Sequence, residues 1–381
     1  MIFTSSQVSI CPGKGEYGVE IHEISEQLQT IKHSKALWSV FDYKKCKDVY
    51  GYDSNGLRRY ALIIQLQYDA TLTENDKPLL RYLMKDEIDM HKYHPYQGHY
   101  ESMDIVAYLL AKFRDVNHIQ LFEQAKLCNF DTYYGFDTEY LFSAGIEETI
   151  KYVEQNDLYR ISSYFQEIQD EIETMYTAEY LEQWFQSKVR WYPTNIEEES
   201  LITLMDRAVV FGNIEEARVL LRQLEESLEP EENHFSLLYY RSKELEEYDK
   251  ALYYLEKQLP YAEEPFDKVS LWLNFAELYM LKQEWDQAFE SVKQCEKELK
   301  AFSSWKRTGL GRSLTETLLD ISLAVRESDK SLAREAYRWA DQMLKTTNNN
   351  SYVILKKAHQ CAKAFHLKKE FRYGVFSPKE R

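Results

Sequence analysis

Three of the chain's nine histidines lie close together in the segment HKYHPYQGHYE, residues 91–101. Imidazoles serve as acid–base groups near neutral pH and as metal ligands, so such a cluster raises the question of a metal-dependent reaction. Two histidines on one helix face the same ion when they are four residues apart. His91 and His94 are three apart, and His99 lies beyond a proline and a glycine. The spacing therefore favours a polar loop between two helices, with His91 half buried on an apolar face, over a metal site.

Other patterns that carry chemistry are weaker. GKGEYGVEI, from Gly13, matches the G-x-G-x-x-G phosphate loop, but no alternating strands and helices follow it, and neither H-R-D nor D-F-G occurs. We interpret it as a turn. No G-x-S-x-G or H-E-x-x-H occurs either, and paired acids such as Glu246 and Glu247 are typical of solvated helix faces. The sequence thus predicts no catalytic residue, no cofactor and no bound metal, with an enzyme that uses the histidine loop as an alternative.

The composition limits the partners. The 381 residues carry a net charge of −16, which repels nucleic acid and suits a basic protein or peptide. No apolar run reaches the roughly 18 residues of a membrane span, and the first residues do not resemble a signal peptide. The five cysteines are odd in number and widely spaced, which fits reduced thiols in the cytoplasm. These features predict a cytoplasmic protein without a membrane partner.

Only 12 glycines and 8 prolines interrupt the chain, so helices dominate. In DKPLLRYLMKDEIDMHKY, residues such as Leu80, Leu83, Met84 and Ile88 follow the helical period. NFDTYYGFDTEYLF is expected to be a loop, with Asp137 as the N-cap of a following helix. We expect an irregular N-terminal segment (1–56), a region of helix pairs (57–195), a repeat region (196–365) and a basic C-terminal tail (366–381).

The repeat region contains a recurring pattern. WLNFAELYMLKQEWDQAFESV places small residues at Ala276 and Ala288, where two helices can approach closely, with large residues between them. The same offsets recur from Leu201 and from Phe235, and the three starts are 34 and 37 residues apart. This pattern resembles the tetratricopeptide repeat, over about residues 200–295, although larger residues replace its usual glycine.

The resemblance implies an all-α, right-handed α-solenoid of antiparallel helix pairs with a concave groove lined by the first helix of each pair. Carried over by position, the lining consists of Ile202, Asp206, Val209, Ser236, Tyr240, Lys243, Leu273, Glu277 and Met280. The alternative is that these residues simply face water. A groove of this kind suits a non-enzymatic adaptor or scaffold that binds a protein or peptide. A peptide-sensing regulator of the bacterial type, acting on a protein effector, is the second interpretation.

Overall fold

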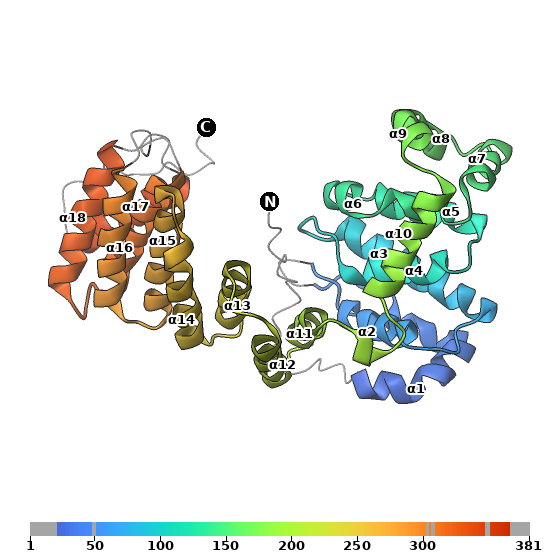
Figure 1. Ribbon diagram of the computed structural model, residues 1–381, viewed down its shortest axis with the longest axis horizontal. Coiled ribbons are helices and arrows are strands. Elements are labelled where there is room, and N and C mark those ends of the chain that lie inside the picture. Colours follow the sequence, from blue (N-terminus) through green and yellow to red (C-terminus); the bar gives the residue numbers. More distant parts are fainter. Residues whose placement is uncertain (1–20, 48–50, 302–304, 306–308, 347–350, 366–381) are drawn as a thin grey trace. The chain divides into compact units, whose positions relative to one another are not determined.

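The computed structural model describes residues 21–47, 51–301, 305, 309–346 and 351–365. The chain forms two compact units, residues 1–217 and 218–381. The described part is helical and contains no strand, only an isolated bridge between Lys45 and Asp53. The expected all-α class is therefore confirmed (Figure 1). No described helix has the length and apolar character needed to cross a membrane. The glycine-rich segment from Gly13 and the basic tail at 366–381 lie outside the described residues.

Unit 1 contains α-helices connected by short loops and 3₁₀ turns. Its 3₁₀ turns are η1 (Lys35–Phe41), η2 (Glu74–Asp76), η3 (Val116–His118), η4 (Thr138–Phe142) and η5 (Ile196–Glu198). Its α-helices are α1 (Ile21–His33), α2 (Gly56–Gln67), α3 (Lys77–Tyr93), α4 (Glu101–Ala111), α5 (Ile119–Lys126), α6 (Phe130–Gly135), α7 (Ile146–Gln155), α8 (Tyr159–Glu167), α9 (Gln169–Thr174), α10 (Ala178–Trp191) and α11 (Leu201–Val210); α12 (Ile214–Ser227) contains the boundary between the units.

Helix α4 lies at the centre of unit 1. Its sequence ESMDIVAYLLA is apolar on nearly every side, and residues 105–111 are all buried. A helix without a polar face belongs inside a core, and α4 packs against both α2 and α3. The charged residues within α4 are Glu101 and Asp104, which lie in its first turn, where carboxylates interact favourably with the helix dipole. Both residues recur in the polar contacts described below.

Unit 2 is built from helices that pack in adjacent pairs. Helix α13 packs against α14, α15 against α16, and α17 against α18, with α19 on α17. Alanines at the helix contacts, including Ala251, Ala276 and Ala288, are fully buried, as expected from their spacing. The elements of this unit are α13 (Glu232–Glu244), α14 (Tyr248–Gln258), η6 (Leu259–Tyr261), α15 (Pro265–Leu281), α16 (Trp285–Leu299), α17 (Gly309–Ala324), α18 (Lys330–Thr346) and α19 (Tyr352–Ala364).

Two expectations about local structure are wrong. The segment 1–56 was expected to be irregular, but residues 21–33 form α1, whose Ile24 and Ile31 are buried two turns apart. The stretch from Asn129 was expected to be a loop, but it forms α6 and η4. The reason is a capping box: the Asn129 side chain accepts from the Thr132 backbone N–H at 2.9 Å, and the Thr132 hydroxyl accepts from the Asn129 N–H.

Candidate functional site

Six of the nine predicted groove residues lie on two helices of unit 2. Ser236, Tyr240 and Lys243 are on α13, and Leu273, Glu277 and Met280 are on α15. We call these six residues the α13–α15 face. All six retain solvent exposure, whereas Leu238, Tyr239 and Ser242 on α13 are buried in the unit. Successive residues of an α-helix turn by about 100°, so a buried stripe necessarily leaves the opposite stripe of the helix in solvent.

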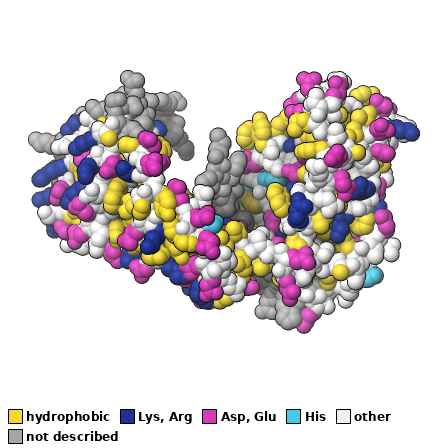
Figure 2. Space-filling model, in the orientation of Figure 1, with side chains coloured by type: hydrophobic (Ala, Val, Ile, Leu, Met, Phe, Trp, Pro, Cys, Tyr) yellow, Lys and Arg dark blue, Asp and Glu magenta, His cyan; other side chains and the backbone are white. Residues whose placement is uncertain are grey.

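The structure brings two residues of this face into direct contact. The Lys243 ammonium lies 2.6 Å from a carboxylate oxygen of Glu277, and so links the first helices of two successive pairs. Tyr240 is 49% exposed and packs edge-on against the buried Tyr239, with 4.8 Å between ring centroids. The face therefore presents the exposed ring of Tyr240, which packs on Tyr239, and the charged pair of Lys243 and Glu277. Figure 2 shows hydrophobic side chains gathered over α14 and α15 of unit 2.

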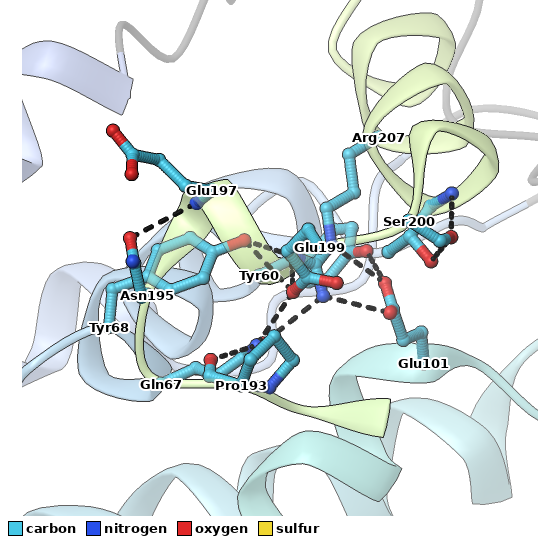
Figure 3. Close-up of polar contacts among 11 residues, drawn as sticks. Tyr60, Gln67, Tyr68, Glu101, Pro193, Asn195, Glu197, Glu199, Ser200 and Arg207 are labelled. Carbon is cyan, nitrogen blue, oxygen red and sulfur yellow. Dashed lines mark hydrogen bonds and ion pairs between the residues drawn. The ribbon is translucent and has the colours of Figure 1, made fainter. Parts of the chain in front are cut away.

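The other three predicted groove residues, Ile202, Asp206 and Val209, lie on α11 in unit 1 and are half-buried. Their neighbour Arg207, which the sequence analysis overlooked, is buried. It is the centre of a polar network (Figure 3). Its guanidinium donates to Glu101 through Nη2 at 2.9 Å and Nε at 3.2 Å, and to Glu199 through Nη1 at 2.9 Å. The charge of Arg207 is thus shared between two carboxylates.

Neutral side chains complete this network. Arg207 also donates to the Tyr68 hydroxyl at 2.6 Å and to the Gln67 carbonyl at 3.1 Å. Tyr68 and Gln67 in turn donate to Glu199, at 3.0 Å and 2.7 Å. The hydroxyl of Tyr60 donates to Glu101. Tyr60, Gln67 and Arg207 are thus all hydrogen-bonded, and the network fastens α11 to α2 and α4.

The electrostatics of the network point to structure rather than acid–base catalysis. Burial lowers the pKa of Arg207, but the charge of Glu101, its hydrogen bond and the nearby Tyr60 and Tyr68 together raise that pKa overall. Burial, reinforced by the neighbouring carboxylates, raises the pKa of Tyr60 and Tyr68 well above the ordinary value. A guanidinium that never loses its proton and phenols that stay protonated cannot exchange protons near neutral pH. No sequence signal joins Arg207 to Glu101, because the two residues are 106 positions apart.

The histidine segment is a loop between α3 and α4, as predicted. His91 lies near the end of α3 and is only 2% exposed, so it is more deeply buried than expected. Its Nδ1 donates to the Glu87 carbonyl at 2.8 Å, and its Nε2 accepts from the Tyr100 backbone N–H at 3.1 Å. Both ring nitrogens are thus used in structural hydrogen bonds. Asn129 holds the loop by donating to the carbonyls of His91 and Gly98.

The three histidines do not converge on one point. The His99 Nε2 atom lies 3.2 Å from the Asp104 carboxylate, and the His94 ring packs against Tyr52 and Tyr100. Burial lowers the pKa of His91 to about 3. Burial also lowers the pKa of His99, but the charge and hydrogen bond of Asp104, together with the charge of Asp137, leave that pKa raised. Among the described residues, no group of three or more His, Cys, Asp or Glu side chains is arranged to hold a metal ion.

Neither the models of known protein families nor the sequences of curated proteins match this chain. Among the chain's own surfaces, the α13–α15 face carries six of the nine residues that the sequence pattern predicted for a groove.

Proposed function

We propose that this chain is a non-enzymatic scaffold of the tetratricopeptide-like class, and that its α13–α15 face binds a protein segment or peptide. The helix pairs of unit 2 stack in sequence order, through contacts of α14 with α15 and of α16 with α17. We further propose that they form a right-handed solenoid, because the alanine spacing matches repeats with that geometry. In such an array the first helices of successive pairs lie side by side, and the 2.6 Å contact between Lys243 and Glu277 supports that register.

The exposed ring of Tyr240 is the observation that carries the binding proposal. Aromatic rings supply much of the binding energy at protein interfaces, and they do so best when they are held in place before binding. The buried Tyr239 supports one edge of the Tyr240 ring, and the helix backbone fixes its position. Leu281, 45% exposed at the end of α15, adds apolar surface to the same helix as Met280.

The partner should match this mixture of groups. An apolar side chain would pack on Tyr240 and Met280, while a charged group beside it would exchange with the Lys243–Glu277 pair. Such an exchange costs little because exposed ion pairs contribute only about 0–1 kcal/mol.

We also propose that the protein is located in the cytoplasm. The described cysteines Cys46, Cys128, Cys295 and Cys361 form no disulfide.

The experiment compares Tyr240→Ala with Tyr253→Ala in capture of the main co-purifying protein by the tagged full-length chain. Tyr253 is 52% exposed and lies on α14, the other helix of the same pair, so it controls for the loss of an exposed ring. Loss of a central aromatic anchor costs about 2 kcal/mol, or about thirtyfold in Kd. We expect Tyr240→Ala alone to lose the partner while its thermal melt stays unchanged. Equal binding by both variants would exclude the α13–α15 face.

A further inference from the structure

A second candidate binding surface lies in unit 1, on a groove of about 580 Å³ between α3, α5 and the start of α8. Its volume falls within the range of ligand-binding clefts. Apolar side chains form part of its lining: Ile88 and Ile161 are buried, and Leu127 and Leu158 are half-buried. Gln120 and Gln124 also line it, both from α5. We call this surface the glutamine groove; it shares no residue with the α13–α15 face and does not depend on the proposed scaffold role.

The two glutamines are placed to act together. They are four residues apart on α5, and the opposite side of that helix is fixed in the core by Leu121, Phe122 and Ala125. Both glutamines are exposed, and neither carboxamide makes a hydrogen bond to any other described residue. The exposed glutamines on α10 differ, because Gln183 and Gln186 donate to carboxylates of their own helix. The groove carboxamides thus keep their donors and acceptors for a ligand.

The spacing of the glutamines matches an extended peptide. A carboxamide offers one acceptor and two donors, so it can accept from a peptide N–H and donate to a peptide C=O at the same time. Residues four apart on an α-helix are separated by about 6 Å along its axis. Equivalent peptide groups in an extended chain recur every two residues, or about 6.6–6.8 Å. Two glutamines one turn apart can therefore bind alternate peptide units of one extended segment.

The charges that line the groove indicate which side chains a bound peptide should carry. Arg160 and Glu123 form an ion pair at 2.6 Å and largely cancel each other. Asp89 and Asp157 are exposed on the lining, and neither pairs with a cation among the described residues. Lys92 is the remaining cation, with its ammonium 5.2 Å from the centre of the Tyr93 ring. The lining therefore carries a net negative charge, which favours a peptide that contains lysine or arginine.

We propose that the glutamine groove binds an extended peptide segment of a partner protein, through main-chain hydrogen bonds to Gln120 and Gln124 and through a basic side chain near Asp89 and Asp157. Recognition of this kind reads the peptide main chain first and its side chains second, as in strand-like peptide binding. The apolar floor then accommodates the side chain that points away from the carboxamides.

The test uses a phage library of random dodecapeptides, selected on the immobilised full-length chain. Enriched peptides are synthesised, and their Kd is measured for the parent chain, for Gln120→Ala/Gln124→Ala and for the control Gln183→Ala/Gln186→Ala. We expect enriched peptides that carry lysine or arginine and that lose about tenfold or more in Kd only with the first variant. N-methylation of alternate peptide nitrogens should abolish their binding, because it removes the main-chain donors.

Two results would overturn the proposal: no peptide enriched on the parent chain, or peptides that bind the Gln120→Ala/Gln124→Ala variant as tightly as the parent. A separate variant keeps this test distinct from that of the α13–α15 face. Tyr240→Ala should leave binding of these peptides unchanged; if it alone abolishes binding, the peptides occupy the α13–α15 face and the glutamine groove is refuted. Circular dichroism of each variant checks that the helices are intact.

Discussion

Lys243 and Glu277 form an ion pair at 2.6 Å between the first helices of two successive helix pairs. The Glu277 side chain is 51% exposed and that of Lys243 is 26% exposed, so water screens the pair strongly. A contact of this kind contributes little to the stability of the fold, and both charges remain available to a partner. The α13–α15 face can therefore be altered without unfolding unit 2.

Charge reversal at Lys243 tests this separation. In Lys243→Glu the new carboxylate would face Glu277, and we expect the free energy of unfolding to fall by less than about 1 kcal/mol, as for exposed ion pairs. The double variant Lys243→Glu/Glu277→Lys should restore it. Urea unfolding followed by circular dichroism gives both values. A loss of several kcal/mol in the single variant would mean that the pair is part of the core and not of a binding face.

Ala288 should be intolerant of any larger residue. It is fully buried on α16, against α15, and the close approach of these helices leaves no room for added methylene groups. We expect Ala288→Leu to lower the free energy of unfolding by about 1–3 kcal/mol through overpacking. Gln287→Leu, at the exposed neighbouring position, is the matched control and should melt like the parent. Equal melts for the two variants would place the helix contact elsewhere.

The packing of unit 2 in helix pairs could be predicted from the sequence, because the spacing of the alanines is visible within each repeat. Ala251 and Ala288 lie at the same offset in successive repeats, Ala276 is the small residue on the first helix of its pair, and all three are fully buried. The exposure of Tyr240 follows from the same periodicity. The sequence also contains local signals for the two helices that were not predicted. The buried isoleucines of α1 are seven residues apart, and Asn129 and Thr132 have the spacing of a capping box.

Long-range polar contacts were not accessible in this way. Arg207 lies between two predicted groove residues, and its side chain is buried against Glu101 and Gln67, 106 and 140 positions away. A single sequence shows that an arginine is present but not which carboxylate it reaches. The glutamine groove could not be predicted for the same reason. In the sequence Gln120 and Gln124 look like ordinary solvated residues of α5, and only the fold places α3 and α8 beside them.

Removal of Arg207 should be strongly destabilising. Arg207→Met leaves the carboxylate of Glu199, whose side chain is 1% exposed, without its cation. Breaking a buried ion pair from one side typically costs about 3–5 kcal/mol, because the remaining charge stays buried. We expect a loss of that size in urea unfolding of unit 1, and partial recovery in Arg207→Met/Glu199→Gln. If the double variant were no more stable than the single one, the uncompensated charge would not be the cause.

His91 should make the protein sensitive to acid. Burial lowers its pKa in the folded chain to about 3, whereas an unfolded histidine titrates near 6.5. Between these values the unfolded state binds more protons, so this contribution to stability is complete above about pH 6.5 and is lost as the pH falls towards 3. One such group changes the free energy of unfolding by at most about 1.4 kcal/mol per pH unit. His118, whose pKa burial lowers to about 4, acts in the same direction.

The variant His91→Gln should therefore flatten the dependence of unfolding free energy on pH between about 6.5 and 4, although it lowers stability at pH 7 through the loss of a buried hydrogen bond. His99→Gln is the control with the opposite sign. Asp104 raises the pKa of His99, so its contribution is complete below about pH 6.5 and is lost only as the pH rises through the folded pKa. The His99→Gln variant should alter the slope above pH 6.5 and keep most of the acid slope, because burial lowers the pKa of His91 more than the charge of His99 does. Urea unfolding at half-unit pH steps measures both slopes, and an unchanged acid slope in His91→Gln would show that another group controls the loss of stability in acid.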